Sequence, residues 1–208
     1  MSDFNSLTAS ELGDKIGQGE IDPVELTEHF LSQIGLSPIG KKIYSTITSQ
    51  LALEQAKESK RRADLGCRLS SLDGVPISWK DLFDIKGYPC EAGSELLSGR
   101  LANKNSKVYN FAEAHGLICL GKTHMSELAF SGLGLNPIRE TPPCVNYPGS
   151  VPGGSSSGAA TSVSFSLAAA GIGSDTGGSV RIPAAWNDLV GFKTTAGKLS
   201  LDGVVPLC

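Results

Sequence analysis

Gly153-Gly-Ser-Ser-Ser-Gly158 and Gly173-Ser-Asp-Thr-Gly-Gly-Ser-Val-Arg-Ile-Pro-Ala184 are two stretches rich in glycine and serine. The run between them, residues 157–170, is uncharged and mostly Ala, Ser and Thr, which predicts a helix buried on nearly all sides. Turns at opposite ends of one helix can fold back into a single site. Because Ser179 follows two glycines, successive backbone N–H groups around it can point inward as an oxyanion hole.

A serine nucleophile needs a base, and histidine is the usual one. The chain contains three histidines, His29, His115 and His124. All three precede Ser156, whereas hydrolases with the G-x-S-x-G motif, which residues 154–158 satisfy, place their histidine after the serine. A buried lysine is the remaining option. Lys80 follows the apolar strand expected over residues 75–79, where burial would lower its pKa enough for it to act as a base.

Residues 116–123 match the phosphate-binding pattern G-x-x-x-x-G-K-[ST] letter for letter. In a phosphate-binding loop, the residues between the glycines must leave their backbone N–H groups free for phosphate. Here those residues are Leu-Ile-Cys-Leu, which favour a buried strand, and Gly116 is placed to end the preceding helix. The pattern therefore does not predict a nucleotide site.

Capping signals divide the N-terminal third into helices. Thr8 and Glu11 form a capping box, and Asp22 followed by Pro23 marks the start of a second helix. Further expected elements are helices over residues 49–64 and 106–115 and short strands over 75–79, 117–120, 171–174 and 189–192. This pattern predicts an α/β fold with a mixed β-sheet flanked by helices. We expect a single domain over residues 1–208, with a helical start at about 1–65 and a core at about 74–208.

Composition narrows the class of protein. The 208 residues are 40% hydrophobic and 19% charged, as in an ordinary globular protein. A net charge of −3 provides no basic surface for nucleic acid, and no stretch is apolar enough for a membrane span. The start lacks the pattern of a secretory signal, so the expected location is cytoplasmic. Five widely spaced cysteines without C-x-x-C predict neither a disulfide framework nor a zinc site.

Taken together, the two serine-rich stretches resemble the sequence signature of the amidase signature family. Two further segments match motifs of that family, Gly74-Val-Pro-Ile-Ser-Trp-Lys80-Asp81 and Gly121-Lys-Thr-His-Met-Ser-Glu127. The resemblance covers nearly the whole chain. It implies that Ser179 is the acyl nucleophile, that Ser155 is a bridging serine after a cis peptide bond, and that Lys80 is the final base.

The resemblance also implies supporting roles. The backbone N–H groups that would hold an oxyanion, together with that of Ser179, belong to Thr176, Gly177 and Gly178. Met125 lies in a segment that would line the substrate pocket. Asp175 and Arg181 would pair and brace the turn that carries the nucleophile. Neither a metal nor an organic cofactor is implied.

The function implied is hydrolysis of a linear amide C–N bond through a Ser-Ser-Lys triad and an acyl-enzyme intermediate. The substrate would be a small-molecule amide, and the protein could form a homodimer. Two alternatives stay open. The A subunit of the Glu-tRNA(Gln) amidotransferase, a glutaminase that supplies ammonia to partner subunits, shares the same motifs, and a non-catalytic fragment is the other. Because family members are longer, the chain is expected to be the N-terminal part of a truncated fold. Exposed apolar surface would then make it poorly soluble and inactive on its own.

Overall fold

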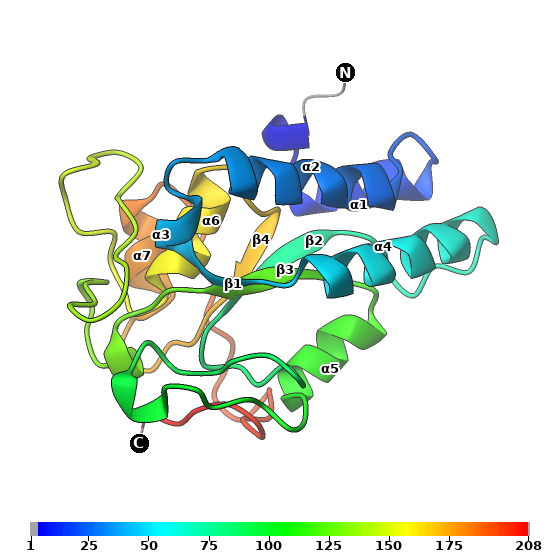
Figure 1. Cartoon of the computed structure of the whole chain (residues 1–208). Helices are drawn as coiled ribbons and strands as arrows, with labels where there is room; N and C mark the ends of the chain where they lie inside the picture. Colours follow the sequence, from blue (N-terminus) through cyan, green and yellow to red (C-terminus); the bar gives the residue numbers. More distant parts are fainter. Residues whose placement is uncertain (1–3, 208) are drawn as a thin grey trace.

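The computed structural model describes residues 4–207, which form a four-stranded sheet with helices around it (Figure 1). The strands are β1 (Tyr44–Ile47), β2 (Pro76–Lys80), β3 (Ile118–Thr123) and β4 (Ala170–Ile172). The helices are α1 (Ala9–Gly17), α2 (Pro23–Leu36), α3 (Gly40–Ile43), α4 (Ser49–Asp64), α5 (Lys107–Ala114), α6 (Ser157–Ser164) and α7 (Arg181–Trp186), with 3-10 turns at Phe4–Ser6, Glu95–Leu97 and Glu127–Ala129. The strand order is β1-β3-β2-β4. Strand β1 runs antiparallel to β3, whereas β2 runs parallel to both of its neighbours, which confirms the mixed α/β sheet.

The N-terminal helices begin where their capping residues predict. Thr8 Oγ1 accepts the Glu11 N–H at 3.3 Å, and the Glu11 carboxylate accepts the Thr8 N–H at 2.7 Å, which completes the capping box of α1. Asp22 accepts the Val24 N–H at 2.7 Å, and Pro23 is the first residue of α2. Helices α2 and α4 pack against each other and against β3. Local capping signals therefore determine where helices α1 and α2 begin.

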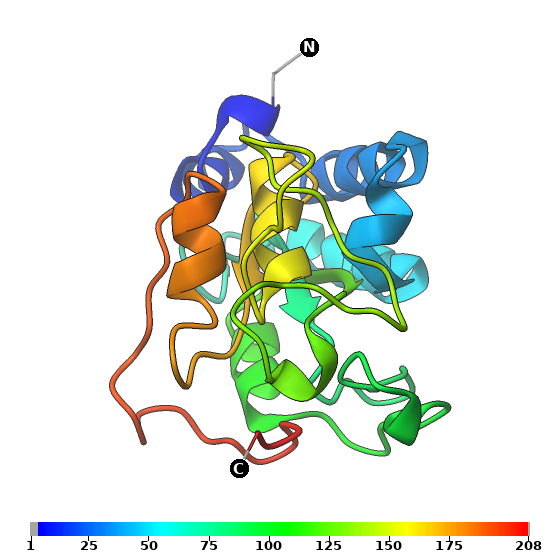
Figure 2. The same ribbon diagram turned by 90° about the vertical axis from the view of Figure 1, so that its left-hand side faces the viewer.

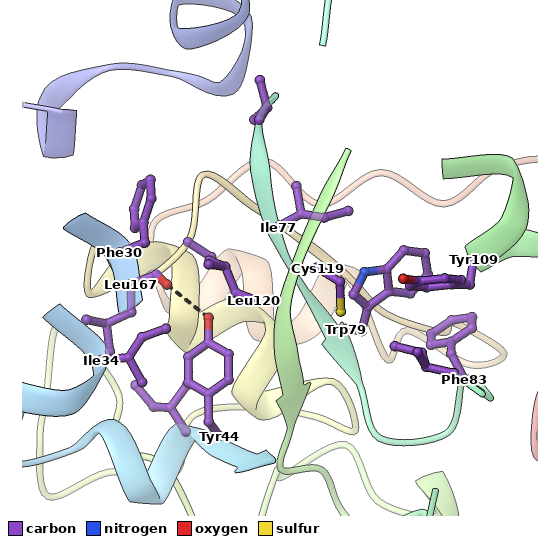
Figure 3. Packing of buried hydrophobic residues seen from close by; sticks show 14 of the residues in the cluster. Phe30, Ile34, Tyr44, Ile77, Trp79, Phe83, Tyr109, Cys119, Leu120 and Leu167 are labelled. Carbon is purple, nitrogen blue, oxygen red and sulfur yellow. Dashed lines mark hydrogen bonds between the residues drawn. The ribbon is translucent and has the colours of Figure 1, made fainter. Parts of the chain in front are cut away.

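Apolar side chains on both faces of the sheet form the core (Figure 3). On one face, the Trp79 ring of β2 packs against the rings of Phe83 and Tyr109, with centroid separations of 5.5 and 5.2 Å. On the other face, the Tyr44 hydroxyl donates to the Leu167 carbonyl at 2.9 Å. Because both faces are covered, every residue of β2 is buried.

Helix α6 is shorter than expected. The sequence predicts a helix over residues 157–170, but α6 ends at Ser164. Ser166 then takes a φ of 55°, in the left-handed region, and the chain turns back so that β4 can pair with β2. Near the start of α6 only a glycine fits at position 158, because a Cβ there would lie 2.6 Å from the His124 carbonyl oxygen. Tertiary pairing therefore limits this helix, and the prediction for its last turns was wrong.

The strand expected over residues 189–192 is absent. This segment joins no strand ladder, and Val190 is 98% exposed. The expected strand at 171–174 is confirmed as β4, which begins one residue earlier and ends two residues earlier. Three short elements had no clear sequence signal: α3, β1 and α7.

Among the described residues, one edge of β4 has no strand partner, and residues 189–191 line a hollow together with Ala170 and Gly171 of this strand. Within residues 4–207, β4 pairs with β2 alone. The segment after α7 runs down the outside of the molecule, coloured orange to red in Figure 2. Its exposed apolar residues are Val190, Phe192, Leu199 and Leu201. The expected exposure of apolar surface is confirmed, whereas low solubility stays a prediction.

Two further sequence expectations concern membrane spans and cysteines. Among the helices described between residues 4 and 207, none combines the length and the apolar character needed to cross a bilayer. Cys67 is exposed, and the three buried thiols are Cys90, Cys119 and Cys144; none of these four is in a disulfide. Cys208 lies outside the described residues.

Candidate active site

Lys80 is the last residue of β2, and its side chain is completely buried. Its Nζ donates to Ser155 Oγ at 2.6 Å and to Ser174 Oγ at 2.8 Å. Ser78, two residues earlier on the same face of the strand, hydrogen-bonds to Ser162 of α6 at 2.7 Å between hydroxyl oxygens. The face of β2 that carries Lys80 is therefore directed at α6 and at the serines beside it.

Burial lowers the pKa of the Lys80 amine from its ordinary value of 10.5 to about 7. The Asp175 carboxylate acts in the opposite direction, but it is paired with Arg181 at 2.9 Å. The direct partners of Lys80 in the structure are two neutral hydroxyl groups. An amine with a pKa near 7 is neutral in a large fraction of molecules at neutral pH and can therefore accept a proton.

Ser155 lies just before α6, and the Gly154–Ser155 peptide bond is cis, as the resemblance implies. The Ser155 side chain is fully buried, and its backbone carbonyl accepts the Ser126 N–H at 3.2 Å. The neighbouring Ser156 points elsewhere, because its hydroxyl donates to the Ser174 carbonyl at 3.2 Å. Of these two adjacent serines, the structure thus brings Ser155 to Lys80.

Ser179 lies between β4 and α7 and is partly exposed. Its backbone carbonyl accepts the Ser156 N–H at 3.1 Å, and Ser174 N–H donates to Ser156 Oγ at 3.3 Å. Ser156 therefore ties the turn after β4 to the start of α6. Within residues 4–207 the Ser179 hydroxyl forms no hydrogen bond, so the structure joins Lys80 to Ser155 but does not join Ser155 to Ser179.

Asp175 braces the turn that carries Ser179. Its carboxylate accepts the backbone N–H groups of Gly178, Val180 and Arg181 at 2.8, 3.2 and 3.3 Å. The Arg181 guanidinium adds two hydrogen bonds of 2.9 Å and holds the pKa of Asp175 well below its ordinary value. The expected pair of Asp175 and Arg181 is confirmed.

The predicted oxyanion donors are not equivalent in the structure. Gly178 is buried, and its N–H is directed at Asp175. Thr176 and Gly177 are exposed on the same turn. The N–H groups of Thr176, Gly177 and Ser179 have no acceptor among residues 4–207, so they are the groups available to a carbonyl oxygen.

A hollow of about 400 Å³ lies beside Ser126. Its lining residues are Ser126, Glu127, Leu128, Phe130, Ser131, Leu135 and Pro137. Ser126 links this hollow to the site through its hydrogen bond to the Ser155 carbonyl. Met125, the predicted substrate contact, is completely buried in the core, and its carbonyl accepts Asn136 Nδ2 at 2.9 Å. The residues that follow Met125 line the hollow, and a role for Met125 itself stays a prediction.

Lys122 of the phosphate-binding pattern is also explained. It lies within β3, fully buried, and its Nζ is 2.9 Å from Asp81 Oδ1 and 2.9 Å from the Pro89 carbonyl. The residues between the two glycines form the strand itself. Lys122 is therefore engaged inside the protein, and the segment has no open phosphate-binding loop.

Sequence reasoning missed Ser174 and Ser126. Ser174 contacts Lys80 directly, yet a serine after Gly173 has no local feature that separates it from an ordinary turn residue. Its place two residues after the β4 strand is the signal that could have indicated it, because Lys80 ends the neighbouring parallel strand. Ser126 directly follows Met125 in the matched segment 121–127, and this position is the signal that could have indicated it.

Comparisons with known proteins bear on the family of the chain. A family model described as Amidase matches residues 25–208. Among curated proteins, the chain is 36% identical over 213 aligned residues to the A subunit of the glutamyl-tRNA(Gln) amidotransferase of Acinetobacter baylyi, covering 99% of this chain and 42% of that protein. It is 39% identical to the subunit of the same name from Anaeromyxobacter dehalogenans, covering 94% of this chain and 40% of that protein.

Solved structures of amidases have a similar fold. The peptide amidase from Stenotrophomonas maltophilia superposes with a TM-score of 0.90 at 29% identity, over 98% of this chain and 43% of that one. A bacterial aryl acylamidase superposes with a TM-score of 0.79 at 28% identity, over 88% of this chain and 38% of that one. The chain thus spans less than half the length of the relatives it matches.

Proposed function

Because the chain belongs to the amidase family, we propose that it carries the Ser-Ser-Lys machinery of a hydrolase that cleaves a carboxamide C–N bond. The observation that supports this most directly is the buried hydrogen bond of 2.6 Å between Lys80 Nζ and Ser155 Oγ. The pKa of about 7 for Lys80 gives the amine the basicity that a proton relay needs near neutral pH.

The reaction begins when Ser179 Oγ attacks the amide carbonyl carbon. As the new C–O bond forms, the Ser179 hydroxyl gives its proton to Ser155, whose own proton moves to neutral Lys80. The C–N bond then breaks, and the proton returns through Ser155 to the leaving amine. Water adds to the resulting ester by the same relay, which releases the carboxylic acid and restores Ser179.

Charge that develops on the carbonyl oxygen would be stabilised by the backbone N–H groups of Thr176, Gly177 and Ser179. The Gly178 N–H, bound to Asp175, would instead hold the shape of the turn. The hollow lined by residues 126–137 would receive the substrate, a small amide with an uncharged, partly apolar group.

Covalent labelling tests this proposal. A small fluorophosphonate phosphonylates an activated serine with loss of fluoride, and mass spectrometry locates the modified residue. The chain alone is expected not to turn over amides, but labelling requires only an activated serine. We expect labelling of the chain at Ser179, loss of labelling in Ser179→Ala, and a rate lower by about 10²-fold or more in Ser155→Ala and Lys80→Ala. Ser164→Ala in α6, whose hydroxyl is bound to the Thr161 carbonyl, is the matched control.

The control Ser164→Ala should label at the rate of the parent, and so should His29→Ala. A chain that unfolds cooperatively but shows no labelling at Ser179 would overturn the hydrolase proposal. That result would support the alternative of a non-catalytic fragment.

A second candidate function is supported by the names of the curated relatives. The same serine chemistry acting on glutamine would release ammonia to partner subunits, as in a Glu-tRNA(Gln) amidotransferase. Release of ammonia from glutamine only after the other amidotransferase subunits are added would favour this candidate. Hydrolysis of simple amides without partners would favour the stand-alone amidase.

A further inference from the structure

Ser174 is the second hydroxyl group on Lys80. The Lys80 Nζ donates to Ser174 Oγ at 2.8 Å, on the turn just after β4. The bond to Ser155 comes from the start of α6. The amine is therefore held between two hydroxyl groups from different segments of the chain.

The direction of the Lys80 lone pair decides whether the amine can act as a base. A neutral amine has two N–H groups and one lone pair at roughly tetrahedral angles. To accept the Ser155 proton, the lone pair must point at Ser155 Oγ. An N–H directed at another acceptor would fix this orientation, and Ser174 Oγ is that acceptor in the structure.

We propose that Ser174 is a positioning residue for Lys80: its hydroxyl accepts one N–H of the neutral amine and so turns the lone pair toward the Ser155 hydroxyl. The inference rests on the proposed function, because it assigns a role within the same proton relay. Ser174 itself transfers no proton in this scheme.

The backbone of Ser174 is held in place by Ser156. Ser156 Oγ donates to the Ser174 carbonyl at 3.2 Å and lies 3.3 Å from the Ser174 nitrogen, which donates to it. Because the Ser156 N–H also donates to the Ser179 carbonyl, one residue fixes both the orienting hydroxyl and the nucleophile turn. Because its backbone is held in this way, the Ser174 hydroxyl can fix the orientation of the Lys80 amine.

The charged groups near Lys80 do not supply this orientation. Asp175 follows Ser174 and raises the Lys80 pKa, but its oxygens are occupied by Arg181 and by backbone N–H groups. Asp81 follows Lys80 along the chain and is paired with Lys122 of the neighbouring strand β3. Hydroxyl groups are thus the direct partners of Lys80.

The test compares Ser174→Ala with Ser174→Thr in the full 208-residue chain. Two readouts are taken between about pH 6 and pH 10: the NMR titration of ¹³C-labelled lysine, with Lys80 identified by loss of its signal in Lys80→Met, and the rate of fluorophosphonate labelling at Ser179. Ser164→Ala is again the matched control. Ser174→Cys, which keeps the side-chain size but accepts hydrogen bonds weakly, replaces Ser174→Ala where that variant fails to fold.

In Ser174→Ala we expect the Lys80 pKa to fall by about one unit, because the ammonium form loses an acceptor. The labelling rate at high pH should fall about tenfold or more, because the lone pair is no longer directed at Ser155. Ser174→Thr keeps the hydroxyl, so it should keep the pKa of the parent and a labelling rate within about twofold of it, as should the control. Loss of packing alone would lower the labelling rate at Ser179 without changing the pKa of Lys80.

An unchanged pKa and an unchanged rate in Ser174→Ala would overturn the proposal. A lower rate with an unchanged pKa that Ser174→Thr does not restore would also overturn it, since that pattern indicates a structural role. If the parent itself is not labelled, the proposed function fails. The NMR titration then still tests the hydrogen bond between Lys80 and Ser174, because an unchanged Lys80 pKa in Ser174→Ala would refute it.

Discussion

Replacing Lys80 by methionine should remove a pH dependence from the stability of the chain. Methionine keeps the apolar stem of the side chain but cannot be charged. In the folded parent, burial lowers the Lys80 pKa to about 7, against an ordinary value of 10.5. At about 1.4 kcal/mol per unit, this shift means that charging Lys80 in place costs about 5 kcal/mol.

The sign of the effect follows from proton binding. Between the two pKa values the unfolded chain carries a protonated Lys80 and the folded chain a neutral one, so the unfolded state binds more protons and stability rises with pH. Below the folded pKa both states are protonated and the full penalty remains. Integrated from pH 7 to pH 9, the free energy of unfolding of the parent should rise by about 2 kcal/mol relative to Lys80→Met.

Urea unfolding at several pH values measures this difference, and the contributions of all other titrating groups cancel between the two proteins. Lys57→Met, at an exposed position of α4, makes the same chemical change in solvent and is the control. The difference between the control and the parent should stay constant with pH over this range. A constant difference between Lys80→Met and the parent would refute the buried, neutral lysine and with it the base of the relay.

Three further predictions concern the scaffold around the site. Lys122→Met should lower the free energy of unfolding by about 3–5 kcal/mol because Asp81 stays buried without its partner, and adding Asp81→Asn should recover part of that loss in urea unfolding. Thr8→Ala should lower stability by about 1 kcal/mol through loss of the α1 cap, seen as a lower Tm, without changing Ser179 labelling. Asp175→Asn should slow Ser179 labelling about tenfold, because the turn loses charge-assisted hydrogen bonds, and a rate equal to the parent's would contradict the brace.

The parts of the fold that local chemistry determines could be predicted from the sequence. Caps at Thr8 and Asp22 place the starts of α1 and α2, because a side-chain oxygen satisfies backbone N–H groups whatever the rest of the chain does. The end of α6 could not be predicted, since nothing in the run of small residues up to Ala170 marks it. It is set by the pairing of β4 with β2. The apolar residues 189–192 resemble a strand, but a strand also needs a partner, and this segment has none in the structure.

The site residues also differ in how far the sequence alone indicates them. Lys80 could be singled out because it ends a strongly apolar strand, and burial is what changes its chemistry. Ser155 and Ser179 were assigned from the family resemblance, and the structure brings the first of them to the lysine. Ser174 was missed, because its place just after β4 indicates a role only once the pairing of β4 with β2 is known.

The pairing of β2 with β4 explains why distant segments meet at Lys80. The two strands are parallel, with Trp79 opposite Ile172. Lys80 and the residues after β4 therefore lie together at the carboxyl ends of these strands. Helix α6 precedes β4 and packs against it, which brings the start of α6, with Ser155, to the same carboxyl ends of the strands. The relay therefore depends on the inner edge of β4, where it meets β2. The exposed apolar segment beyond the outer edge contributes no hydrogen bond to Lys80, so the base can be assembled in this chain whether or not that surface is covered.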